Sequence, residues 1–237
     1  MTRRLALVLA MMPVSAWAQG TFDGTLNGTM TASGTVIPFR YAQLGSHIRT
    51  EYTMEGNSVV TIFDATTGNM LYIIPQQKKY LVSNLRESGG IARQMARAMM
   101  GRGAGGDVPD FSKMKVTPTG QRETIAGVSC EHYLFEYADS AKAKNKVDMC
   151  GAPGMGFMGL AGQEGSMMPS TVAMMRSQNP ALAKLAHQGF FPLKMNIMGE
   201  HGTAVWTVTQ LNRGRPDATL FQPPAGYTEL KIPTGHD

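Results

Sequence analysis

The stretch SVVTIFDATTGNMLYIIPQQKKYLVSNL, residues 58–85, decides the fold class. It contains three short runs rich in Val, Ile, Tyr and Phe, at 58–65, 69–75 and 78–85, and Gly, Asn, Pro and Gln separate them. Short runs of this kind, bounded by turn residues, are typical of β-strands. Their spacing of about 10–12 residues predicts consecutive antiparallel hairpins, which can curl into a barrel or half-barrel.

The same pattern continues on both sides of this stretch. Further strand-like runs lie at 35–42, 46–54, 113–120, 122–138 and 144–153, with residues 139–145 as a hairpin turn. Residues 190–212 indicate one more hairpin, with GEHG (199–202) as its turn. The sequence therefore predicts a mainly β protein in which a long antiparallel sheet is the principal element.

Two segments have helical periodicity instead. They are residues 91–101 and 166–189, and Pro180 is expected to kink or split the second. A curled sheet with a concave apolar face needs a cover, because bare apolar patches are costly in a soluble protein. We therefore predict a mainly β (α+β) fold: a curled antiparallel sheet that forms a half-barrel and is covered by two helical segments.

The chain begins with the pattern of a signal peptide, MTRRLALVLAMMPVSAWAQG. Arg3 and Arg4 precede a short apolar core, and Ala16-Trp17-Ala18 fits the small-x-small cleavage rule. The apolar run is shorter than the roughly 20 residues that span a bilayer. We predict a signal peptide at 1–18 with cleavage near Ala18-Gln19, a single domain at 19–237 without a transmembrane segment, and a periplasmic or secreted location.

Charge argues against a nucleic-acid partner. The formal net charge is +5 for the whole chain, and loss of Arg3 and Arg4 lowers it to +3. A nucleic-acid-binding domain usually carries a strong basic stripe. Contact with anionic lipid is compatible with this mild charge.

The two cysteines, Cys130 and Cys150, are predicted to form a disulfide, because an exported chain enters an oxidising space and an even count favours pairing. The predicted strands place them on neighbouring strands near the open end of one hairpin. The alternative is a nucleophilic Cys130 beside His132, since residues two apart on a strand share a face. The second cysteine makes the disulfide the simpler interpretation.

No catalytic motif stands out. The five histidines have no metal-ligand spacing, Ser129 is not in a nucleophile elbow, and GRGAGG (101–106) lacks the Lys-Ser/Thr of a phosphate loop. The sequence predicts no enzyme, no cofactor and no histidine metal site. Sixteen of the 19 methionines follow residue 18, and methionine clusters can bind Cu(I) or Ag(I). Methionine is also an adaptable filler of apolar surfaces, and we favour that interpretation.

Four segments in order resemble a known family. They are residues 62–80, 119–133, 189–197 and 207–230, the last being TVTQLNRGRPDATLFQPPAGYTEL. Together they resemble a family of exported bacterial proteins catalogued as domain of unknown function 4412. That family is similar in fold to the LolA/LolB-like outer-membrane lipoprotein carriers. The resemblance implies a half-barrel lidded by helices around an apolar cavity, and it brings no established chemistry.

The closing residues are interpreted as closure of that fold. Phe221 is expected to pack at the sheet, and Pro223 and Pro224 cannot donate ladder hydrogen bonds, so they end strand pairing. Gly226 allows a reversal after which Tyr227 packs back.

These observations favour a non-enzymatic carrier or binder of an apolar ligand, a lipid or an acylated peptide. The alternatives are a methionine-rich copper or silver protein and a structural or protein-binding module with a filled core. The predicted ligand-binding residues are Ile62, Tyr72, Ile74, Phe135, Met195, Ile197 and Trp206 from the sheet, and Met95, Met99, Met175 and Leu182 from the helical segments.

Overall fold

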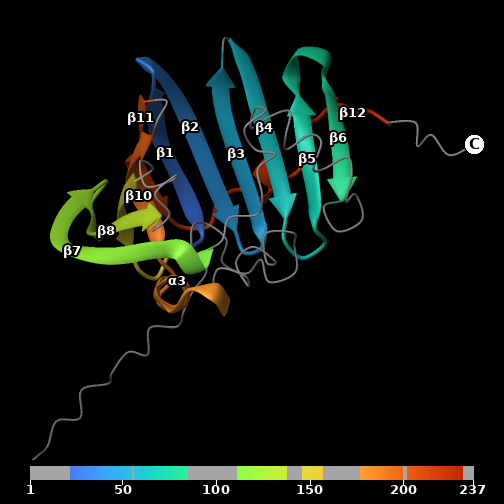
Figure 1. Ribbon diagram of the computed structural model, residues 1–237. Coiled ribbons are helices and arrows are strands. Elements are labelled where there is room, and N and C mark those ends of the chain that lie inside the picture. The colour runs from blue at the N-terminus through green and yellow to red at the C-terminus, as the bar shows by residue number, and fades with distance from the viewer. Residues whose placement is uncertain are drawn as a thin grey trace, which may run out of the picture.

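The computed structural model describes residues 22–54, 56–84, 111–137, 146–156, 177–199 and 202–231. They form one 12-stranded sheet in the order β12-β6-β5-β4-β3-β2-β1-β11-β10-β9-β8-β7 (Figure 1). The strands are β1 (Gly24–Ala32), β2 (Thr35–Leu44), β3 (His47–Met54), β4 (Asn57–Asp64), β5 (Asn69–Ile74), β6 (Lys79–Asn84), β7 (Met114–Ile125), β8 (Val128–Tyr137), β9 (Lys146–Ala152), β10 (Phe191–Gly199), β11 (Gly202–Arg213) and β12 (Thr228–Glu229). The predicted mainly β fold is confirmed in this form.

Strands β1 to β6 make a meander of antiparallel hairpins, as residues 58–85 predicted. Polar turns connect them. At the β4–β5 turn, Asp64 accepts hydrogen bonds from the Thr66 N–H (2.9 Å) and the Thr67 hydroxyl (2.7 Å). Between β5 and β6 lies a short 3₁₀ helix, η1 (Pro75–Gln77), and Lys78 ends it in a left-handed conformation with φ 50°.

The hairpin of β7 and β8 differs from the prediction in its turn. The sequence placed a break near Gly120, between strands at 113–120 and 122–138. The structure instead has one strand from Met114 to Ile125 and a turn at Ala126-Gly127. The pairing shifts between Pro118 and Arg122, so Gly120 marks a bulge inside the strand. A bulge and a turn use the same residue types, which explains the error.

The N-terminal strand and the C-terminal hairpin meet in the middle of the sheet. Strand β1 pairs with β2 on one side and with β11 on the other, and Asn27 donates to Gln210 at 3.0 Å across 183 residues of sequence. This junction joins the β1–β6 meander to the β7–β11 half, so the two halves share one continuous ladder.

In the described part of the second predicted helical segment, residues 177 and 178 are helical, Asn179 is extended, and α3 (Pro180–His187) begins after it. The segment is therefore split at Pro180, as predicted. Proline is well tolerated at the first helical position, because that N–H has no intrahelical partner. Asn179 caps the helix, accepting from the N–H groups of Ala181 and Leu182.

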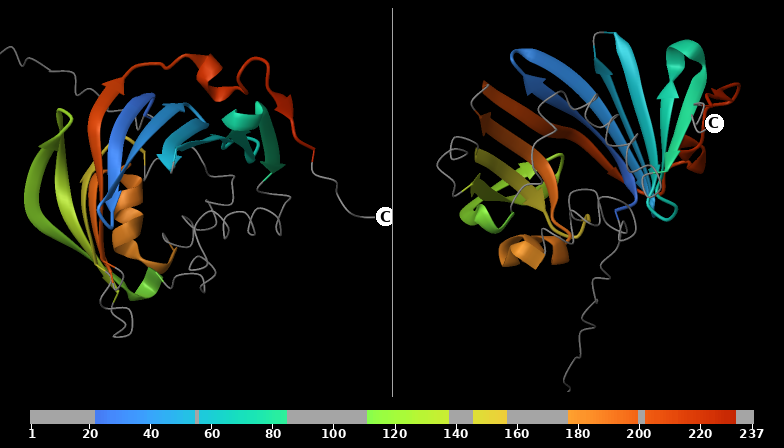
Figure 2. Two further views of the ribbon diagram at one scale, coloured as in Figure 1. Left: turned by 90° about the horizontal axis from the view of Figure 1, so that it is seen from above. Right: turned by 45° about the vertical axis from the view of Figure 1, so that its right-hand side comes forward.

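The sheet is curved, and its two faces carry different covers (Figure 2). Helix α3 lies on the concave side, where Leu182 and Leu185 pack with Phe135, Met149 and Phe190. The C-terminal segment crosses the convex side, and η5 (Ala218–Phe221) places Phe221 in a cluster with Ala42, Val60, Ile62 and Ile73. The expected packing of Phe221 against the sheet is confirmed.

Several predicted features lie outside the described residues: the signal peptide at 1–18, the helical segment at 91–101, the turn at 139–145, and residues Met95, Met99 and Met175. Within the described ranges, no helix has the length and apolar character needed to cross a bilayer.

Candidate functional site

An apolar patch lies on the concave face at the middle of the sheet. Its members are Met30, Phe39, Met195, Ile197 and Trp206, and we call them the Trp206 patch. Trp206 is directly opposite Met30 on one side and Met195 on the other, so the three side chains share a face. Met30 is 37% exposed and Ile197 is 40% exposed. Met195 packs against the buried cluster beside α3, which we call the α3 cluster and which includes Phe135, Met149, Leu182, Leu185 and Phe190.

The patch depends on a close approach at Gly28. This glycine is paired with Phe39, and a Cβ atom there would collide with the Phe39 ring and the Thr207 carbonyl. Without a side chain on β1, Phe39 from β2 and Trp206 from β11 meet across that strand. Their rings stack with centroids 4.9 Å apart and planes 12° from parallel. The stacked pair thus extends over three neighbouring strands, β2, β1 and β11.

The predicted ligand residues divide between the two faces. Phe135, Leu182 and Met195 come together in or against the α3 cluster. Ile197 is paired with Val147, which packs against the α3 cluster, so Ile197 also lies on the concave face. Tyr72 also points to the concave side, because register relates it through Thr61 and Thr50 to Tyr41. Ile74, two residues further along β5, points the same way.

Ile62 is a correction to the predicted surface. It is paired with Leu71, whereas Tyr72 is paired with Thr61, so Ile62 and Tyr72 lie on opposite faces. Ile62 is 1% exposed and packs near Phe221 on the convex side. Alternation fixes which residues of one strand share a face, but it does not say how neighbouring strands are aligned.

On β10, Leu193 and Met195 pack into different hydrophobic clusters. Leu193 is fully buried in the cluster around the disulfide, whereas Met195 packs against the α3 cluster. The β9–β10 pairing shifts between Pro192 and Lys194, so Leu193 is an extra residue in β10. Such a bulge bends the strand and redirects the side chains beside it.

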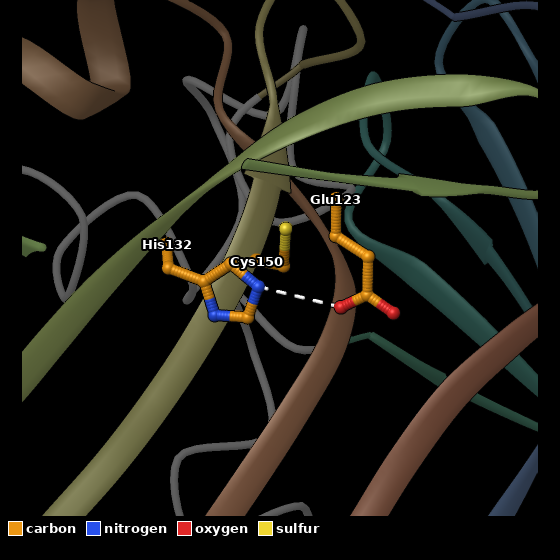
Figure 3. Close-up of side chains that lie close together, drawn as sticks. All are labelled: Glu123, His132 and Cys150. Atoms are coloured by element: carbon orange, nitrogen blue, oxygen red, sulfur yellow. Dashed lines mark ion pairs between the residues drawn. The ribbon is translucent and has the colours of Figure 1, made fainter. Parts of the chain in front are cut away.

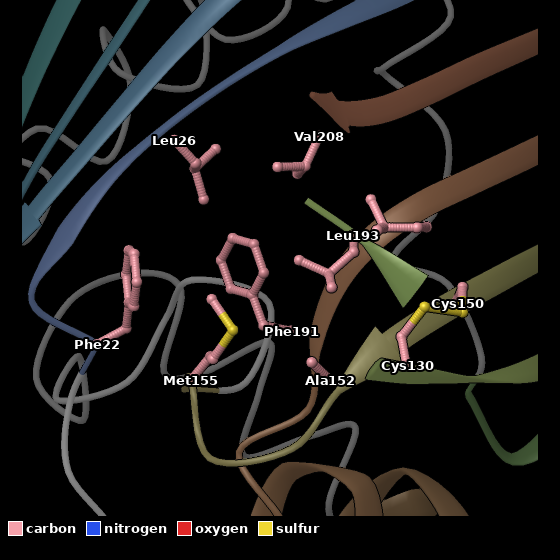
Figure 4. Packing of buried hydrophobic residues seen from close by; sticks show 10 residues of the cluster. Phe22, Leu26, Cys130, Cys150, Ala152, Met155, Phe191, Leu193 and Val208 are labelled. Atoms are coloured by element: carbon pink, nitrogen blue, oxygen red, sulfur yellow. A yellow bond between two sulfur atoms is a disulfide. The ribbon is translucent and has the colours of Figure 1, made fainter. Parts of the chain in front are cut away.

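Cys130 and Cys150 form the predicted disulfide between β8 and β9, with their Cα atoms 5.4 Å apart. Both are buried, in a cluster with Phe22, Leu26, Met155, Phe191, Leu193 and Val208 (Figure 4). The bond excludes the alternative of a nucleophilic Cys130 in this form of the protein. It joins β8 and β9, the strands that carry His132 and Asp148.

A ladder of four charged or titratable side chains crosses β7 to β10, and sequence analysis missed it. Its members, which we call the charge ladder, are Glu123, His132, Asp148 and Lys194, one from each strand. His132 Nδ1 lies 2.9 Å from Asp148 Oδ1, and His132 Nε2 lies 3.3 Å from Glu123 Oε2. Lys194 Nζ donates to both Glu123 oxygens at 3.1 Å. His132 itself is only 8% exposed.

The signal for this ladder was present but spread over four segments. Asp148 and Lys194 each stand between two apolar residues, Glu123 and His132 do not, and only the register brings the four together. The curvature of the sheet adds a contact that register alone does not predict, because Lys194 reaches Glu123 three strands away.

Tyrosines near the apolar clusters are held neutral by their surroundings. Burial raises the pKa of Tyr41 well above its ordinary value, and its hydroxyl donates to the fully buried Gln43 at 2.6 Å. Burial, and then the nearby Glu131 carboxylate, raise the pKa of Tyr133, whose ring meets Phe190 edge-on. Both phenols therefore act as hydrogen-bond donors on an otherwise apolar surface.

Two of the described methionines, Met149 and Met155, are packed in the core. Met155 is fully buried in the disulfide cluster and Met149 is 4% exposed in the α3 cluster. Both are surrounded by carbon-rich side chains, which is the environment of a core filler.

A family model described as Domain of unknown function (DUF4412) matches residues 22–227. This match confirms the resemblance that residues 62–80, 119–133, 189–197 and 207–230 indicated. No curated protein matches the chain.

Solved structures also resemble the chain. An uncharacterized conserved protein from Thermus thermophilus is 9% identical, with 90% of this chain and 91% of that chain covered and a TM-score of 0.47. A chain in the MucA/MucB complex from Pseudomonas aeruginosa is 14% identical, with 90% of this chain and 60% of that chain covered and a TM-score of 0.48. A LolA superfamily protein from Nitrosomonas europaea is 9% identical, with 86% of this chain and 90% of that chain covered and a TM-score of 0.28. Similarities at this level concern the arrangement of strands and carry no functional argument.

Proposed function

Because this chain belongs to the family described as Domain of unknown function (DUF4412), whose description assigns no activity, its function has to come from its own residues, and we propose that it is a non-enzymatic binder or carrier of an apolar ligand. The ligand is a lipid or an acylated peptide, held on the concave face of a half-barrel. The protein works outside the cytoplasm, where a disulfide is stable.

The observation that carries this proposal is the exposure of apolar side chains on the concave face. Met30 and Ile197 are more than a third exposed beside the stacked rings of Phe39 and Trp206. Exposed apolar groups that gather on one face of a protein often mark a binding site. Methionine suits a surface that must fit ligands of irregular shape, because its side chain is flexible.

Burial alone supplies enough free energy for such binding. Each methylene group removed from water contributes about 0.8 kcal/mol. An acyl chain lying along the Trp206 patch would therefore gain several kcal/mol without a specific polar contact. A ligand of this kind explains a site made of aromatic, methionine and branched apolar side chains.

The test uses the chain from Gln19 onward, in which Trp206 is the only tryptophan. A fatty acid brominated along its acyl chain should quench Trp206 fluorescence in a saturable manner, since bromine quenches only a ring that it contacts. An unlabelled fatty acid should compete. Absence of quenching by any brominated fatty acid or phospholipid tested would contradict the proposal.

Matched variants on one strand locate the site. Ile197 and Met198 are neighbours on β10, are 40% and 38% exposed, and point to opposite faces. Ile197→Glu should weaken quenching at least tenfold, because it places a carboxylate in the apolar site. Met198→Glu should leave the quenching unchanged. Equal effects of the two variants would reject the concave face as the binding surface.

A further inference from the structure

The charge ladder lies directly against the disulfide. His132 is paired with Cys150 across β8 and β9, and Glu123 is paired with Cys130 across β7 and β8. One ligand atom from each of Glu123, His132 and Cys150 lies within 4.8 Å of the others (Figure 3). Three adjacent strands thus bring a carboxylate, an imidazole and sulfur to one point.

The ligand atoms of His132 and Glu123 face each other. His132 Nδ1 lies 2.9 Å from Asp148 Oδ1, which fixes the Nδ1–H tautomer and turns Nε2 toward Glu123 Oε2 at 3.3 Å. An imidazole lone pair and a carboxylate oxygen repel each other at this distance. A metal ion placed between the two atoms would remove this repulsion and take both as ligands.

We propose that reduction of the Cys130–Cys150 disulfide converts this corner of the sheet into a Zn²⁺ site. The ligands are the two cysteine thiolates, Nε2 of His132 and one carboxylate oxygen of Glu123. Nitrogen, sulfur and carboxylate oxygen in a set of four match the ligands and tetrahedral coordination that Zn²⁺ prefers. The disulfide form withholds both thiolates, so the oxidation state of the cysteines controls the site.

The chemistry balances with a dithiol as reductant. The dithiol transfers two electrons and two protons to the disulfide, which gives two thiols and leaves the reductant as a disulfide. Binding of Zn²⁺ then releases the two thiol protons to solvent. Two thiolates and the Glu123 carboxylate carry three negative charges against the two of the ion, and the Lys194 ammonium, 3.1 Å from Glu123, balances the remainder.

Asp148 is a positioning residue for this site. Histidines that bind metals usually donate their other ring N–H to a carboxylate, which fixes the tautomer and orients the ring. Asp148 already occupies that position at 2.9 Å. The described chain therefore has both the ligand and the partner that such a ligand requires.

The experiment titrates Co²⁺, a spectroscopic substitute for Zn²⁺, into the full chain. The protein is reduced with a phosphine until thiol titration finds both cysteines free, and it is desalted without oxygen. We expect one Co²⁺ per chain, with a thiolate-to-cobalt charge-transfer absorption that Zn²⁺ abolishes. The disulfide form should lack this absorption. Its absence from the reduced protein would overturn the proposal.

Variants separate a built site from a pair of free thiols. His132→Gln should remove or greatly weaken the cobalt spectrum, and Asp148→Asn should lower the Co²⁺ affinity by roughly 10–100-fold. His47→Gln is the control, because His47 lies 4.0 Å from Asp64 on the same sheet but far from both cysteines in the register. Circular dichroism of each disulfide form verifies folding. A cobalt spectrum that is the same in His132→Gln and in the wild type would overturn the proposal, as would reduced chains that bind Co²⁺ while unfolded.

Discussion

Leu220 and Phe221 are neighbours in sequence, yet they have opposite environments. Leu220 is 38% exposed, whereas Phe221 is 8% exposed and fills the convex cluster of Ala42, Val60, Ile62 and Ile73. The difference arises because η5 turns only one of these side chains toward the sheet. A single residue near the end of the chain therefore covers strands from its first third.

We predict that Phe221→Ala lowers the free energy of unfolding by about 3 kcal/mol, because it removes a buried ring and leaves a cavity. Leu220→Ala should change it by less than about 0.5 kcal/mol, as is usual for surface positions. Urea denaturation of both variants measures the two values. Similar losses in the two variants would show that η5 is not anchored through Phe221.

Asp64 is a residue whose charge supports the β4–β5 turn. Burial raises the pKa of Asp64, but the hydrogen bonds from Thr67 and Thr66 and the nearby His47 outweigh burial, so the net pKa is lowered. A lowered pKa in the folded state contributes stability above the ordinary carboxyl pKa. That contribution is lost as pH falls through the lowered value.

We therefore expect the wild type to lose stability more steeply than Asp64→Asn as pH falls below the ordinary value of 3.8. At neutral pH the variant should be the less stable of the two, and the difference should shrink in acid. Thermal unfolding at a series of pH values gives both curves. Parallel curves would mean that the Asp64 charge does not contribute to the turn.

At the scale of elements, α3 is held by its first residue as much as by its apolar face. Asn179 is 7% exposed, and its side-chain oxygen caps the helix. Its Nδ2 group donates to the carbonyls of Phe111 at 2.9 Å and Met114 at 2.7 Å, next to the start of β7. One side chain thus joins the helix to the edge strand.

Replacing this residue should separate its two roles. Asn179→Ala removes the helix cap, which should lower the free energy of unfolding by about 1 kcal/mol. It also leaves two carbonyls without a donor, which should lower the free energy of unfolding by a further amount of about 1–3 kcal/mol. Asn179→Ser keeps a capping oxygen but loses the donors, so its loss should be smaller by about 1 kcal/mol. Equilibrium denaturation measures both. If the serine variant were as unstable as the alanine variant, the cap would make no contribution to stability.

The sequence predicted the strands better than their connections. Residues 58–85 defined β4 to β6 because each strand is local and bounded by turn residues. The split at Pro180 was predictable, because proline interrupts a helix interior and is well tolerated at the first position of the next helix. Gly120 was misread because a bulge is set by the pairing of two strands, and no single strand records it.

The candidate site shows the same limit more clearly. Phe135, Met195 and Trp206 could be assigned to a face by alternation, whereas Ile62 could not be aligned with Tyr72 without the register. The charge ladder was out of reach, because Glu123 and Lys194 meet only through the curvature of the sheet. Disulfide pairing was predictable, since only two cysteines were available.

At the scale of the whole molecule, the two halves of the sheet depend on a shared core. Leu26 from β1 and Val208 from β11 are each 1% exposed and belong to the cluster that also holds the disulfide. Neither half can bury this cluster by itself. The sheet should therefore respond to mutation at its junction as one unit.

A double-mutant cycle tests this unity. Leu26→Ala and Val208→Ala should show an interaction energy of about 0.5–3 kcal/mol, because the two residues belong to one core. Leu26→Ala combined with Ile62→Val should be additive within about 0.5 kcal/mol, since Ile62 belongs to the separate convex cluster. Additivity in the first pair would contradict a shared core.

The pairing of β1 with β11 also sets an order of events for a chain that is synthesised from its N-terminus. The partner of Asn27 on β11, Gln210, follows it by 183 residues, so β1 emerges long before half of its ladder exists. Until then one edge of β1 has unpaired backbone groups, which can pair with another chain. Folding of this protein therefore finishes only after nearly all of it has been synthesised, and until then β1 lacks its β11 partner.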